Sequence, residues 1–207
     1  MTITRPTAQE LIDNFLDPHS VISWDEPIDI SEYSPEYQQE LLRARERSGC
    51  DESVLTGEGK VQGRPVAFLV GEFRFLAGSI GRDAANRIVN AIRRATERGL
   101  PLVASTASGG TRMQEGTPAF VKMIDISQAI MDHKAAGLPY LVHLRHPTTG
   151  GVFASWGSLG HVTVAEPQAL IGFLGPKVYE VLNDEPFPPG VQISENLRAH
   201  GIIDAVV

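Results

Sequence analysis

A regular alternation of short apolar segments with longer helical segments is the feature that most constrains the fold of this chain. Residues 100–105 and 138–144 are apolar runs of strand length. Residues 116–136, which separate them, have the length of a long helix, and Gly137 follows as a stop signal. Parallel strands need a crossover connection, usually a helix, so this order is typical of a largely parallel sheet. We therefore expect an α/β fold.

Other segments extend the pattern. Residues 53–61 and 65–74 flank a short turn and predict a β-hairpin, and apolar residues at helical spacing predict a helix over 84–95. Further strands are expected at 161–165, 169–173 and 202–207, and further helices at 151–158 and 176–182. The last of these strands is apolar and lacks a closing helix, so we expect a partner or further chain to cover its edge.

The first fifty residues differ from the rest. Thr7 and Glu10 form a capping-box pattern that predicts a short amphipathic helix over 8–16. Ser34 and Pro35 predict the start of a second helix, which Gly49 ends. We therefore divide the chain into a helical N-terminal arm, residues 1–50, and a main domain, residues 51–207.

Composition excludes several classes of protein. Lys and Arg total 18 against 25 Asp and Glu, a net charge of −7, which argues against a nucleic-acid partner or an anionic membrane surface. No run approaches the length of a membrane-spanning helix, and the opening residues lack the apolar region of a signal peptide, so a cytoplasmic location is expected. A single cysteine, Cys50, excludes an intramolecular disulfide and a cysteine-based metal cluster, and no metal is expected.

Two glycine pairs, each after an apolar segment, are the main candidates for chemistry. Gly109 and Gly110 follow the first strand discussed above, and Gly150 and Gly151 follow the second. A glycine pair at the start of a helix presents unpaired N–H groups and a positive helix dipole. Two such loops side by side would form an oxyanion hole for a carbonyl oxygen that gains charge. The alternative, that these are only turn glycines, stays open at this point.

The residues around the glycines resemble the signatures of the carboxyltransferase β subunit of biotin-dependent acetyl-CoA carboxylase. The matching segments are 72–81, 107–115, 147–152, 165–173 and 201–204. The resemblance implies a crotonase-like fold, a spiral of ββα units, preceded here by the helical arm. Many β subunits carry a four-cysteine zinc ribbon, which a chain with one cysteine cannot form.

The resemblance also implies a reaction and a site. Carboxybiotin on a separate carrier protein would donate CO2 to acetyl-CoA, giving malonyl-CoA for fatty acid synthesis. A second, α-type carboxyltransferase half, biotin carboxylase and the biotin carboxyl carrier protein are the implied partners, in an oligomer. The implied catalytic residues are Gly109, Gly110, Gly150 and Gly151. The implied cofactor-binding residues are Thr148, Thr149 and Arg112.

Four alternatives stand against this interpretation. Arg112 could instead form an ion pair that ties the loop to the helix. The chain could be a related acyl-CoA carboxylase or decarboxylase subunit, or a non-catalytic scaffold half that binds a partner carboxyltransferase. Ser155, with His161 nearby, suggests a serine peptidase of the same superfamily, but no third triad member is identified, and a small residue on a packed helix is the favoured interpretation.

Overall fold

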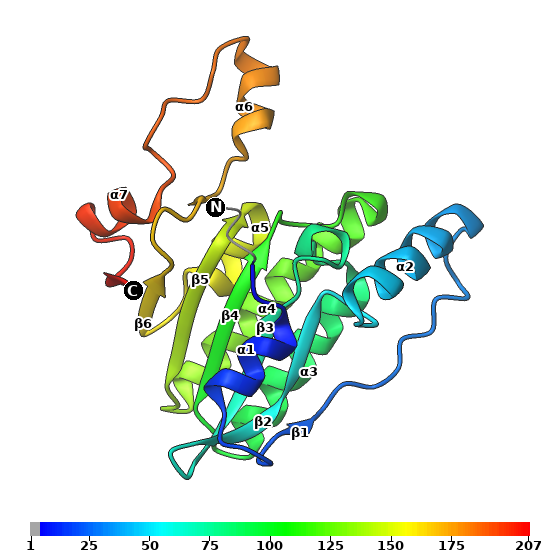
Figure 1. Cartoon of the computed structure of the whole chain (residues 1–207), viewed down its shortest axis with the longest axis vertical. Helices are drawn as coiled ribbons and strands as arrows, with labels where there is room; N and C mark the ends of the chain where they lie inside the picture. The colour runs from blue at the N-terminus through cyan, green and yellow to red at the C-terminus, as the bar shows by residue number, and fades with distance from the viewer. Residues whose placement is uncertain (1–4) are drawn as a thin grey trace.

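The computed structural model describes residues 5–207; the opening residues 1–4, which belong to the segment used to predict location, lie outside the described part. Its centre is a sheet in the order β1-β2-β3-β4-β5-β6-β8, with β7 paired to β5 (Figure 1). The strands are β1 Ile22–Ser23, β2 Val54–Val61, β3 Arg64–Gly71, β4 Leu102–Ser108, β5 Tyr140–Thr149, β6 Val162–Ala165, β7 Ile171–Gly172 and β8 Ala205–Val206.

The direction of the strands confirms the predicted α/β fold. The pairs β1–β2 and β2–β3 are antiparallel, whereas the pairs β3–β4, β4–β5, β5–β6, β5–β7 and β6–β8 are parallel. The predicted hairpin forms between β2 and β3 through Gln62 and Gly63, both with positive φ, which is the backbone of a tight two-residue turn. Its second strand ends at Gly71, earlier than expected.

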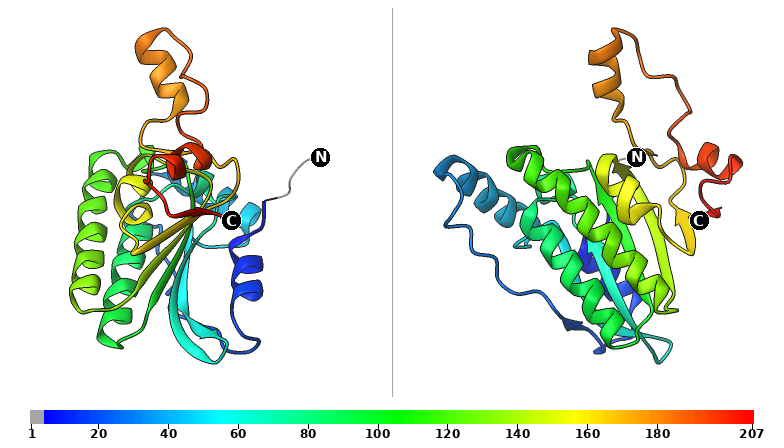
Figure 2. Two further views of the ribbon diagram at one scale, coloured as in Figure 1. Left: turned by 90° about the vertical axis from the view of Figure 1, so that its left-hand side faces the viewer. Right: turned by 180° about the vertical axis from the view of Figure 1, so that it is seen from behind.

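Helices cover the two faces of the sheet unequally. The helices are α1 Ala8–Phe15, α2 Pro35–Ser48, α3 Arg82–Glu97, α4 Thr117–Ala135, α5 Gly150–Val152, α6 Pro176–Asn183 and α7 Ser194–Ala199. The helices α3 and α4 lie side by side on one face, and α1 lies on the other (Figure 2). The main core lies between the sheet and this helix pair, where Ile88 and Ile126 pack against Leu102.

The first fifty residues pack onto the body. Thr7 caps α1 with the predicted capping box, and α1 buries Ile12 and Leu16 against Phe68 of β3. Gly49 ends α2 at φ +73°. The arm also contributes β1 to the sheet, a strand that the sequence pattern does not show.

Other expected boundaries are also wrong, and the strand expected at 169–173 is reduced to β7. β5 continues past the apolar run as far as Thr149, because β7 pairs with its last residues. The helix expected from residue 151 begins at Gly150 and changes at Phe153 into a π-type turn. The expected terminal strand is reduced to Ala205–Val206, because the preceding residues form the unexpected α7 and a turn.

Candidate functional site

The two glycine pairs lie against each other at the carboxyl ends of β4 and β5. A Cβ built on Gly110 would lie 3.3 Å from the carbonyl oxygen of Thr149 and 3.5 Å from the Cα of Gly150. A Cβ on Gly150 would in turn lie 3.4 Å from the Cα of Gly110. Both residues also have positive φ, +111° and +63°, which L side chains rarely adopt. The structure therefore brings the predicted loops together in a close backbone contact that favours glycine at both positions.

The four glycines differ in what their N–H groups do. The Gly109 N–H donates to the carbonyl oxygen of Ala77 at 2.9 Å, and the Gly110 N–H donates to Ser108 Oγ at 3.0 Å. The helix expected over 116–136 is α4, which begins at Thr117, several residues after this pair, so the pair does not lie at a helix N-terminus. Gly150 and Gly151, in contrast, lie in the first helical turn, whose N–H groups have no partner in a preceding turn.

Gly151 is closely packed and Gly109 is not. A Cβ on Gly151 would lie 2.7 Å from Oγ1 of Thr111 and 3.2 Å from Cγ of Met123. The atom nearest to a Cβ on Gly109 would be the Ala77 carbonyl oxygen, at 3.6 Å, and Gly109 is exposed with no positive φ. Ala77 itself has φ +55° and ψ +31°, in the left-handed region.

Thr148 and Thr149 make their hydroxyl contacts inside the protein. Oγ1 of Thr148 lies 2.8 Å from Oγ1 of Thr106 and donates to the carbonyl oxygen of Arg145 at 2.9 Å. Oγ1 of Thr149 donates to the carbonyl oxygen of Ser108 at 3.4 Å. Both side chains are buried, so they brace β5 against β4 immediately before the second glycine pair.

Arg112 is buried in a polar network, and only 1% of its surface is exposed. Its guanidinium donates two hydrogen bonds to the Glu52 carboxylate and lies 3.5 Å from Glu115. Burial alone would lower the pKa of Arg112, but the hydrogen bonds and charge of Glu52 raise it above its usual value. Tyr37 of α2 donates to Glu115 at 2.7 Å and completes the network. Of the two roles considered for Arg112, this geometry favours the ion pair that holds the loop.

The network partners Glu52 and Tyr37 were missed at the sequence level. They stand 60 and 75 residues before Arg112, and no local pattern marks either as its partner.

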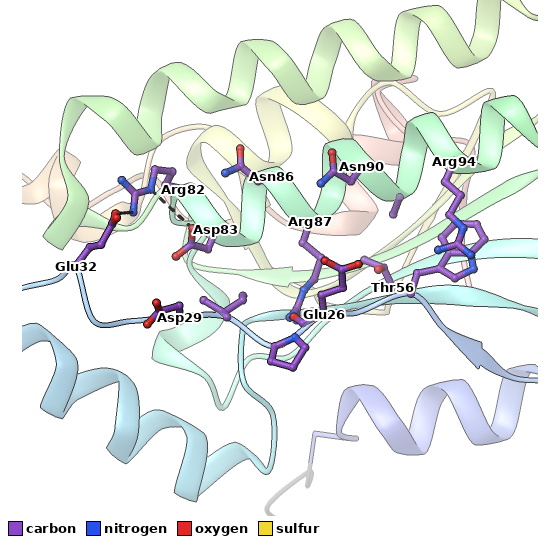
Figure 3. A pocket seen from close by; sticks show the side chains of 14 residues that line it. Glu26, Asp29, Glu32, Thr56, Arg82, Asp83, Asn86, Arg87, Asn90 and Arg94 are labelled. Atoms are coloured by element: carbon purple, nitrogen blue, oxygen red, sulfur yellow. Dashed lines mark hydrogen bonds and ion pairs between the residues drawn. The ribbon is translucent and has the colours of Figure 1, made fainter.

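A polar pocket of about 500 Å³ lies between residues 24–32 and α3 (Figure 3). Within its lining, Arg82 lies 3.9 Å from Glu32 and 3.7 Å from Asp83. Arg87 pairs with two carboxylates outside the lining, Asp51 at 2.9 Å and Asp25 at 3.4 Å. Arg94 stacks on the Trp24 ring, 4.8 Å from its centroid. None of the predicted site residues lines this pocket, which is where the arm rests on α3.

The residue pair considered for peptidase chemistry is engaged elsewhere. Ser155 Oγ donates to the carbonyl oxygen of Gly151 at 2.6 Å, and His161 Nδ1 accepts the backbone N–H of Tyr140 at 3.0 Å.

Among residues 5–207, no group of three or more His, Cys, Asp or Glu side chains is arranged to hold a metal ion. Within the same range, no helix has the length and apolar character needed to span a membrane.

Comparison with known proteins gives the family. The carboxyl transferase domain model matches residues 5–204. The probable biotin-dependent acyl-coenzyme A carboxylase beta3 subunit of Mycobacterium tuberculosis H37Rv is 61% identical over 206 residues, covering 99% of this chain. This chain spans only 41% of that relative's length. The acetyl-coenzyme A carboxylase carboxyl transferase subunit beta of Opitutus terrae is 41% identical, covering 97% of this chain and 70% of the relative.

Solved structures agree on the fold. Transcarboxylase 12S superposes with a TM-score of 0.80 at 23% identity, covering 96% of this chain and 37% of that one. A Pseudomonas malonate decarboxylase hetero-dimer gives a TM-score of 0.76 at 22% identity, covering 98% and 79%. These likenesses confirm the predicted crotonase-like α/β fold. With the domain match and the Opitutus terrae relative, they lead to one conclusion: the chain belongs to the carboxyl transferase domain family, together with the carboxyl transferase β subunits of acetyl-CoA carboxylase.

Proposed function

We propose that this chain is the carboxyltransferase component of a biotin-dependent acyl-CoA carboxylase, acting on acetyl-CoA to form malonyl-CoA. The observation that carries the proposal is the contact between Gly110 and Gly150, where backbone atoms of the two loops meet. Carboxybiotin, on a separate carrier protein, would supply both the CO2 and the base. The chain's own task is then to position the acyl group and to stabilise negative charge on its oxygen.

The geometry supports a division of this task among the glycines. We assign the donor role to the Gly150–Gly151 turn, which opens a helix. Gly109 and Gly110 already donate within the protein, so their part is to allow the close approach of the two loops. Thr148 and Thr149 hold the turn in register, and Arg112 holds the first loop through Glu52.

The partners are part of the proposal. An α-type carboxyltransferase half would complete the site, with biotin carboxylase and the carrier protein delivering the carboxyl group in a cytoplasmic complex. Apolar side chains support a partner surface on α6, which stands away from the body just after β7 (Figure 1). Val178, Val181 and Leu182 of this helix are 52%, 84% and 73% exposed.

A second candidate has its own support. The 61%-identical mycobacterial relative is named as an acyl-coenzyme A carboxylase subunit, without a stated acyl chain. A longer acyl-CoA is therefore the alternative substrate. A scaffold half is less well supported, because an interface alone has no need of a contact that favours glycine.

The test is carboxyl transfer in reverse. The chain, mixed with an α-type half, is given free biotin and carboxyl-labelled malonyl-CoA or methylmalonyl-CoA, and labelled carboxybiotin is counted. Faster transfer from malonyl-CoA supports the proposal, and faster transfer from methylmalonyl-CoA supports the second candidate. Absence of transfer from both, with an intact complex by gel filtration, contradicts the enzymatic role.

A further inference from the structure

A second cavity, separate from the glycine loops, lies between α1 and the open face of the sheet. Its volume is about 550 Å³, within the ~300–1,000 Å³ usual for small-molecule sites. The walls are almost wholly apolar and come from α1 and four neighbouring strands. The lining side chains include Leu11, Ile12, Phe15, Phe68, Val103, Leu141 and Val162. We call this cavity the α1 groove.

Two polar side chains from the strands interrupt the apolar lining, Ser105 of β4 and His143 of β5. Behind them lies Arg145, only 1% exposed, whose Nε donates to Ser105 Oγ at 3.0 Å. Ser105 Oγ lies 3.2 Å from His143 Nδ1. An arginine only donates, so Ser105 Oγ accepts from Arg145, and its own proton is free to bond Nδ1 of His143. With that bond formed, the neutral imidazole carries its proton on Nε2.

Arg145 acts only as a hydrogen-bond donor in this network, because its guanidinium stays charged. Among residues 5–207, no carboxylate lies within 4 Å of its guanidinium, which also bonds the carbonyl oxygen of Gly71. Burial lowers the pKa of Arg145 to about 10, with Glu166 and Glu72 opposing the shift from farther away, so it stays charged at neutral pH. Burial, and then the Arg145 charge, lower the pKa of His143 against the influence of Glu166.

We propose that the α1 groove binds a linear fatty acyl chain whose terminal carbonyl or carboxylate oxygen accepts a hydrogen bond from Nε2 of His143. The chemistry of the lining selects this class of ligand. β3, β4 and β5 are interior strands with neighbours on both sides, so an added peptide strand would find no free edge beneath the groove. An apolar helix laid across it would leave the His143 donor unsatisfied. An alkyl chain with one oxygen at its end matches the apolar walls and the polar strand residues Ser105 and His143; the other polar side chain of the lining, Asn14, comes from α1.

The inference is independent of the proposed carboxyl transfer, because none of the four glycines lines the α1 groove. It is tested by titrating the full chain with octanoate, decanoate and dodecanoate below their micelle concentrations. Saturable binding of one equivalent is expected. Burial of each two added methylene groups strengthens binding by about tenfold.

Two variants locate the ligand. Val162→Asp places a charge on the groove wall at a residue 45% exposed, and Val181→Asp is the matched control on α6, at a residue 84% exposed. Val162→Asp should abolish dodecanoate binding with an unchanged Tm, whereas Val181→Asp should leave binding intact. His143→Phe keeps the groove filled but removes the donor, and should weaken dodecanoate binding by about tenfold.

Dodecanoyl-CoA distinguishes the two sources of the ligand. Binding of both compounds means that a carbonyl oxygen is sufficient, and binding of dodecanoate alone means that a carboxylate is required; either outcome supports the site. Binding without dependence on chain length, or equal binding to wild type and Val162→Asp, overturns it. An absence of binding overturns it as well. If Val162→Asp also dissociates a dimer, the groove is instead an interface between copies of this chain.

Discussion

At the scale of single residues, the contact between Gly110 and Gly150 predicts different effects of substitution at the two members of the first glycine pair, Gly109 and Gly110. Alanine at residue 110 meets both a positive φ and the Thr149 carbonyl oxygen at 3.3 Å, whereas alanine at residue 109 meets nothing closer than 3.6 Å. We expect Gly110→Ala to displace the second loop and lower kcat/KM for carboxyl transfer by about 10²-fold. The matched control, Gly109→Ala, should retain near-normal turnover. Equal loss in both variants would contradict the assigned roles.

Arg112 offers a prediction about stability. Removing its side chain leaves the Glu52 carboxylate buried without its partner, which typically costs about 3–5 kcal/mol. Arg112→Met should therefore lower the free energy of unfolding, measured in urea, by about that amount. The double variant Arg112→Met/Glu52→Gln should recover part of the loss. If the single variant has wild-type stability but binds acyl-CoA poorly, Arg112 is a ligand-binding residue after all.

At the scale of elements, His146 links two strands and predicts a dependence on pH. Its Nδ1 accepts the backbone N–H of Leu170, just before β7, and must be unprotonated to do so. Burial, followed by the charge of Arg5, lowers the pKa of His146, and Glu166 opposes this. The unfolded chain therefore takes up the proton first as pH falls below ~6.5, so this contribution to stability is lost toward lower pH.

The measurement is the free energy of unfolding between pH 7.5 and 5. The wild type should lose more stability on acidification than His146→Asn, whose side-chain oxygen can accept the same bond without titrating. Parallel curves for the two proteins would show that His146 does not carry the effect.

The elements also show how far sequence reasoning reaches. The helices with strong caps, α1 and α2, were predicted almost to the residue, because Thr7, Ser34 and Gly49 act locally. The far end of β5 was missed because its pairing with β7 depends on residues more than twenty positions away. The glycine pairs were found as motifs, but the acceptor of the Gly109 N–H, Ala77, is set by tertiary packing. The partner of Arg112, Glu52, is likewise 60 residues away, just before β2.

At the scale of the whole molecule, the arm behaves as part of the domain. The arm supplies α1 to one face of the sheet and β1 to its edge, and its residues 24–32 line the polar pocket on α3 (Figures 2 and 3). We expect a chain that starts at residue 51 to aggregate, because Val66, Phe68 and Val70 would lose their cover. Expression and gel filtration of the shortened chain provide the measurement, and a soluble monomer with native-like thermal unfolding would show that the division at residue 50 separates two independent units.

The left-handed backbone of Ala77 bears on how this fold can be stabilised. An alanine held in that region costs roughly 1–2 kcal/mol, and its carbonyl oxygen is the acceptor for Gly109. Ala77→Gly would relieve that strain and also release the backbone that fixes the first loop. Selection for thermal stability should therefore favour glycine at residue 77, whereas selection for turnover should favour alanine. A redesign for stability alone would replace Ala77 at the expense of activity.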